Sequence, residues 1–78
     1  MMVPELSVLK TRKLLALLEK LGFSKISQKG SHLKMGKAGS DARSIIVPMH
    51  GEIPRGTLRS ILKQAGIEKE EFLRMLRE

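Results

Sequence analysis

The chain has 78 residues and no cysteine, a length that suits one domain and a composition that excludes a disulfide scaffold, a thiolate zinc site and a cysteine nucleophile. Fifteen lysines and arginines against eight acidic residues leave a net charge of +7. This charge favours an anionic partner such as a nucleic-acid backbone, although a basic protein without that partner fits it equally well. The apolar runs are far shorter than the ~18–20 residues that cross a bilayer, and no secretory signal is recognised. We therefore expect one soluble, cytoplasmic domain over residues 1–78, with no membrane partner.

The first regular element is predicted between Thr11 and Leu21, after an irregular lead-in over residues 1–9. Five leucines in this stretch repeat with helical spacing and form one apolar face, which is typical of an amphipathic helix. We expect Thr11 to cap the helix, and Gly22 to end it in the left-handed conformation that glycine adopts readily.

The next residues alternate between polar and apolar side chains, which is typical of strands that are buried on one face. Three strands are predicted, at 23–28, 31–37 and 43–47. The Lys29-Gly30 turn joins the first two strands as a tight hairpin, the segment 38–41 is expected to turn, and Pro48 closes the third strand.

Side-chain alternation in the second of these strands separates two faces of the predicted sheet. Leu33 and Met35 share one face, and His32 and Lys34 share the other. If the leucine and the methionine fill the core, His32 and Lys34 lie on the open face of the sheet.

The last part of the sequence predicts helices. A loop over 49–56 leads into a helix that begins near Gly56 or Thr57 and ends at Gly66. A short C-terminal helix follows, with Phe72 as one of its apolar residues. The predicted fold class is α+β, with a three-stranded antiparallel sheet, helices on one of its faces, and this short extra C-terminal helix.

His32 is the residue whose predicted position best suits chemistry. An exposed imidazole exchanges protons near neutral pH, and the neighbouring Lys29 and Lys34 can stabilise a pentacoordinate phosphate. These groups are sufficient to cleave RNA through its own 2′-hydroxyl, without a metal or a protein nucleophile. An ordinary surface histidine remains the alternative on the residues alone.

The other titratable residues point less clearly to a site. His50 could serve as a second proton-transfer group or brace its own loop by hydrogen bonds. The acidic residues Glu68, Glu70 and Glu71 suit a helix N-terminus, and Asp41 suits a turn. Because no carboxylates or histidines show metal-ligand spacing, we expect no metal and no other cofactor.

Four ordered segments of the sequence resemble those of the HicA-type toxins of HicAB toxin–antitoxin systems. They are Leu21-Gly22-Phe23, Gln28-Lys29-Gly30-Ser31-His32, Val47-Pro48-Met49-His50 and the stretch Gly56-Thr57-Leu58-Arg59-Ser60-Ile61-Leu62-Lys63-Gln64-Ala65-Gly66-Ile67. The resemblance covers roughly residues 10–73. In place of the second histidine or the aromatic side chains of many members, this chain has Leu33 and Met35, which disfavours stacking of bases on that strand.

The resemblance implies a fold like that of the double-stranded RNA-binding domain, with α-β-β-β-α order. It also implies an mRNA interferase, an endoribonuclease that arrests translation and is neutralised by a HicB-type antitoxin covering the active face. The family's catalytic histidine lies in a Gly-Ser-His motif, which corresponds to His32 here.

These inferences together predict that mRNA lies along a basic face formed by the first helix and the hairpin, with His32 as general acid or base. The residues expected to contact RNA are Lys10, Lys13, Lys29, Ser31 and Lys34. A non-catalytic module that binds double-stranded RNA is the main alternative. A DNA-reading helix-turn-helix over 57–77 is disfavoured because its glutamates would face phosphates, so no direct DNA reading is expected.

Overall fold

The computed structural model describes residues 9–37 and 44–77. The order of elements in these ranges is β1 (Leu9–Lys10), α1 (Thr11–Lys20), β2 (Phe23–Lys29), β3 (His32–Lys37), β4 (Ser44–Pro48), β5 (Glu52–Ile53), α2 (Arg55–Ala65) and α3 (Lys69–Leu76). The predicted α+β fold, with a helix, three strands, a helix and a short extra helix, is confirmed. Residues 1–8 of the lead-in predicted over 1–9, and the turn predicted over 38–41, lie outside the described residues.

Helix α1 forms because its leucines place one continuous apolar stripe against the sheet. Leu14, Leu17 and Leu18 are buried, and Gly22 follows the helix with φ of 101°, as predicted for a left-handed terminator. The expected cap was wrong, because Lys10 is the N-cap residue and makes no side-chain capping hydrogen bond. Thr11 is already helical, and its hydroxyl donates to the carbonyl of His50 instead.

The three-stranded sheet has the order β2-β3-β4 and is antiparallel throughout. The β2–β3 hairpin turns at Gly30, whose φ of 58° lies in the left-handed region that favours glycine. Leu33 and Met35 are buried, as predicted from the alternation, and they lie opposite two buried β4 residues. The register shifts between Lys25 and Ser27 in β2, so this strand carries a bulge that the alternation did not reveal.

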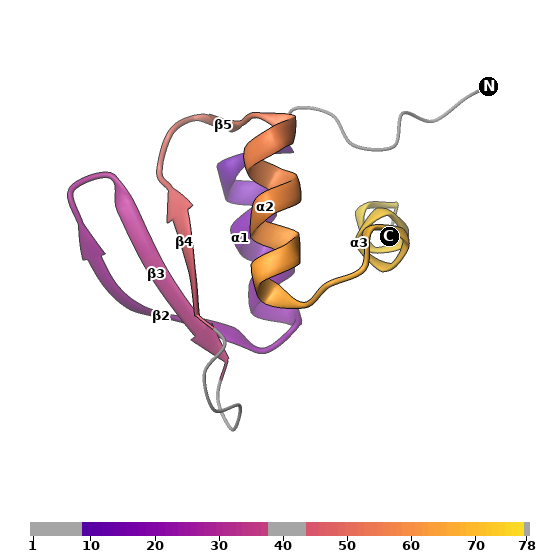
Figure 1. The fold of residues 1–78 in the computed structure, drawn as a ribbon, viewed down its shortest axis with the longest axis horizontal. Coiled ribbons are helices and arrows are strands. Elements are labelled where there is room, and N and C mark those ends of the chain that lie inside the picture. The colour runs from indigo at the N-terminus through magenta and orange to yellow at the C-terminus, as the bar shows by residue number, and fades with distance from the viewer. Residues whose placement is uncertain (1–8, 38–43, 78) are drawn as a thin grey trace.

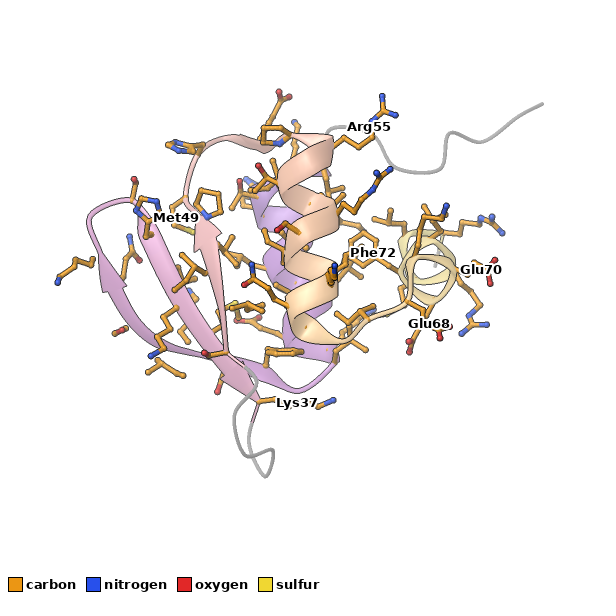
Figure 2. All side chains as sticks on the ribbon, in the orientation of Figure 1. Lys37, Met49, Arg55, Glu68, Glu70 and Phe72 are labelled. Atoms are coloured by element: carbon orange, nitrogen blue, oxygen red, sulfur yellow. The ribbon has the colours of Figure 1, made fainter. Side chains whose placement is uncertain are left out.

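Both long helices cover the same face of this sheet, and the other face is left open (Figure 1). The core between the helices and the sheet holds these side chains of at most 2% exposure: Leu14, Leu17, Leu18, Phe23, Leu33, Met35, Ile45, Val47, Ile53, Leu58, Ile61 and Phe72. Helix α3 lies on the side of α2 away from the sheet and inserts Phe72 toward the core (Figure 2).

A second, two-stranded sheet was missed by the sequence reasoning. Leu9 of β1 lies opposite Ile53 of β5, and Lys10 lies opposite Glu52. The sequence predicts only a lead-in and a loop at these two places, because two-residue strands are too short to show an alternation pattern. This pairing brings the start of α1 to the segment that follows β4.

In the described ranges, no helix is long and apolar enough to cross a membrane.

Candidate functional site

His32 is the first residue of β3 and lies at the hairpin end of the sheet. Lys29 of β2 is its cross-strand partner on one side, and Pro48 of β4 is its partner on the other. Directly opposite residues in antiparallel strands share a face, with Cβ atoms about 4.5–5.5 Å apart. The His32 side chain is exposed and has no hydrogen-bond partner within the described part of the chain. Its imidazole is therefore free to contact a ligand beside Lys29.

Lys34 lies on the same strand as His32, β3, and adds a second lysine to the pair His32 and Lys29. It is exposed two residues after His32 and lies opposite Ser27 and Ile46, so it belongs to the same open face. The structure therefore brings together His32, Lys29 and Lys34, as the alternation predicted.

Ser31 connects the hairpin to the segment after β4. Its backbone carbonyl accepts a hydrogen bond of 2.6 Å from the N–H of Met49. Its hydroxyl has no partner among the residues described, so the expected role of Ser31 in positioning the imidazole stays a prediction. The backbone contact holds His32 and the Met49 segment at the same corner of the molecule.

Thr11 fixes the position of the backbone around His50. Its hydroxyl donates to the carbonyl of His50, and its N–H donates to the carbonyl of Gly51 over 3.2 Å. Thr11 is 5% exposed and is the only buried polar side chain in the described ranges. The loop around His50 is thus held by hydrogen bonds from Thr11 to main-chain carbonyls, and not by the His50 imidazole. The imidazole is exposed and can contact a ligand.

An open groove lies where this segment meets the start of α1. Its lining residues are Lys10, Thr11, Arg12, Lys13, Leu15, Ala16, Met49, His50, Gly51 and Glu52. Two of the predicted RNA-contacting residues, Lys10 and Lys13, therefore lie with His50 rather than on the sheet face with His32. Arg12 and Glu52 also line the groove but were not predicted as site residues. The β1–β5 pairing places Glu52 opposite Lys10, at the start of α1.

The charges of the two surfaces favour an anionic polymer. The sheet face presents Lys29 and Lys34 beside His32, and the groove presents three basic residues and a single carboxylate, that of Glu52. No group of three or more potential metal ligands gathers in the described ranges. Adjacent positive surfaces of this kind can follow a phosphate backbone from one contact to the next.

Thr11→Val is expected to lower the free energy of unfolding by about 1–2 kcal/mol, because valine leaves the His50 carbonyl without its donor. Urea unfolding of the parent, Thr11→Val and Thr11→Ser measures the effect. The serine variant keeps the hydroxyl and is expected to lose less stability than the valine variant. Equal losses in the two variants would contradict a stabilising role for this hydrogen bond.

The fold and the site define the class of protein: a small, basic α+β domain with an exposed histidine between lysines on its open sheet face. The sequence matches the family model of the HicA toxin of bacterial toxin–antitoxin systems over residues 11–67. Because this match covers more than half of the chain, the protein belongs to the HicA toxin family. A comparison with curated proteins finds no match.

Family membership assigns two features of the protein's biology. The chain is the toxin of a toxin–antitoxin system, and its partner is an antitoxin. The matched residues include α1, the whole three-stranded sheet and α2, while β1 and α3 lie outside them.

Proposed function

We propose that this HicA-family toxin is an endoribonuclease that cleaves mRNA and thereby arrests translation in the cytoplasm, with His32 as general acid or base. The observation that carries the proposal is the exposed His32 imidazole beside Lys29 and Lys34 on the open sheet face. An imidazole in reach of solvent and substrate can take or give a proton, and ammonium groups favour added negative charge on a phosphate.

The chemistry follows from the substrate's own nucleophile. The 2′-oxygen forms a bond to the adjacent phosphorus and loses its proton, while the bond from phosphorus to the 5′-oxygen breaks and that oxygen gains a proton. The products are a 2′,3′-cyclic phosphate and a 5′-hydroxyl. His32 carries out one of the two proton transfers as base or acid, and a second group or a water molecule carries out the other. Lys29 and Lys34 stabilise the charge of the pentacoordinate phosphate.

The proposal assigns the remaining predicted residues to binding. Lys10 and Lys13 lie on the groove beside the hairpin corner and contact RNA phosphates there. Ser31, in the turn that precedes His32, positions the imidazole or the phosphate. This arrangement needs no metal and no cofactor.

The antitoxin in this proposal is of the HicB type and covers the open sheet face. Ile46 lies on that face opposite Lys34 and is 45% exposed, and Ile26 in the β2 bulge is 58% exposed. Exposed apolar side chains next to charged ones are typical of surfaces that a protein partner covers. An antitoxin bound there blocks His32 from RNA.

The proposed function is tested by incubating the purified protein with a long RNA in EDTA. Cleavage in EDTA, with cyclic phosphate and 5′-hydroxyl ends on the products, is the expected result. The variant His32→Ala, purified in parallel, controls for contaminating nuclease. RNA that is bound but uncut, in EDTA and again with Mg²⁺ added, would overturn the proposal and identify a non-catalytic RNA-binding module.

A further inference from the structure

The groove between α1 and the segment after β4 has the size of a small-molecule site. Its volume is about 770 Å³, within the range of roughly 300–1,000 Å³ that is usual for ligand pockets. One wall comes from the first two turns of α1, and the other comes from Met49 to Glu52. The wall around His50 and Gly51 is held by the two hydrogen bonds from Thr11, so the groove is built into the fold.

The lining combines two kinds of surface. The apolar surface comes from Leu15, Ala16 and Met49. It is accessible to a ligand, because Ala16 is exposed and the other two residues are only partly buried. Thioether and aliphatic groups pack favourably on flat aromatic rings. Arg12 and Lys13 add positive charge at the same groove, and arginine and lysine side chains pair with phosphate.

We propose that this groove binds an unpaired nucleotide of the RNA strand, with the base on the apolar lining and the adjacent phosphate on Arg12 and Lys13. The inference rests on the RNA substrate of the proposed function and specifies its class as single-stranded RNA. Bases in an A-form duplex are stacked and paired inside the helix, so they cannot enter a groove unless the strand is open.

The groove adjoins the hairpin end of the sheet, where His32 begins β3. Met49, which lines the groove, donates its N–H to the carbonyl of Ser31, the residue before His32. In the proposed arrangement, a strand whose reacting phosphate lies at His32 turns at this corner and places a neighbouring nucleotide in the groove. His50 lies on the groove wall at this junction.

The test measures binding rather than cleavage, using the His32→Ala protein and a fluorescent single-stranded hexanucleotide RNA. In this background Ala16→Glu places a carboxylate in the groove, and Ala16→Gln has nearly the same shape without the charge. Ser60→Glu on α2 adds the same charge away from the groove. We expect Ala16→Glu to weaken binding about tenfold, and the two controls about twofold or less.

Two further measurements make the result specific for an unpaired nucleotide. The His32→Ala protein is expected to bind the single strand at least about tenfold more tightly than a duplex of the same sequence. The logarithm of the binding constant falls linearly with the logarithm of the salt concentration, and Arg12→Ala is expected to make this slope shallower by about 0.7. Lys20→Ala, at the other end of α1, is expected to leave the slope unchanged.

Equal binding by Ala16→Glu and Ala16→Gln, together with an unchanged slope for Arg12→Ala, would overturn the groove assignment. Equal binding of duplex and single strand would overturn the unpaired nucleotide as its ligand. These outcomes are distinct from failure of the proposed function, because a protein that never cleaves RNA still reports whether its groove binds a single strand.

Discussion

Replacing His32 with alanine is expected to lower the rate of RNA cleavage by about 10²–10⁴-fold, the usual contribution of a general acid or base. The side chain is exposed and has no hydrogen-bond partner within the described ranges, so the free energy of unfolding is expected to change by no more than about 0.5 kcal/mol. The combination of a large kinetic effect and a small stability effect separates catalysis from folding. Single-turnover cleavage and urea unfolding of the same preparation measure both quantities.

Two control variants accompany His32→Ala. One removes a positive charge outside the candidate site, and the other removes the second histidine, His50. Lys20→Ala removes an exposed cation from the last residue of α1 and is expected to cleave at the parent rate. His50→Ala is expected to reduce cleavage less than His32→Ala, because His50 lies at the groove rather than on the open sheet face. Cleavage by His32→Ala within a few-fold of the parent rate would remove His32 from the mechanism.

Phe72→Ala is expected to lower the free energy of unfolding by about 3–5 kcal/mol, the usual cost of removing a buried phenylalanine side chain. Phe72 is 0% exposed and is the only buried residue of α3, so it anchors this helix to the core. The expected loss is large against the ~5–15 kcal/mol of stability that single domains usually have. Urea unfolding with a global probe measures the change.

Leu73→Ala is the control for the stability loss expected of Phe72→Ala. Leu73 is the next residue in α3 and is only partly buried against the core, so its replacement is expected to cost about 1 kcal/mol. Under conditions where Phe72→Ala remains folded, its cleavage rate is expected to match that of the parent, because α3 lies beyond α2 from the sheet (Figure 1). A stability loss below about 1 kcal/mol for Phe72→Ala would show that α3 docks without contributing to the core.

The fold serves the proposed chemistry by packing its buried apolar side chains between one face of the sheet and the helices. Both long helices cover the same face, and His32 and Lys34 of β3, which point away from them, stay exposed. The hairpin turn at Gly30 then places Lys29 directly opposite His32. A sheet covered on both faces would have no surface for RNA or for an antitoxin at this position.

Much of the fold and part of the candidate site could be predicted from the sequence, because the signals are local. The leucine spacing predicted α1, and the Lys29-Gly30 turn predicted the hairpin. The alternation around Leu33 and Met35 correctly left His32 and Lys34 on the exposed face. Each of these patterns depends on residues a few positions apart, where backbone geometry alone determines which side chains share a face.

The sequence by itself thus determined the order of the three helices and of the strands of the larger sheet, and the exposure of His32. Only the tertiary structure decided how Thr11 is used, because its hydroxyl meets the His50 carbonyl across 39 positions of the chain. It also decided the β1–β5 pairing and the groove in which Lys10, Lys13 and Arg12 meet His50. Such contacts form between residues that are far apart in the sequence and meet only when the chain folds around its core. A periodic pattern in the sequence cannot predict them, because it reflects only residues a few positions apart.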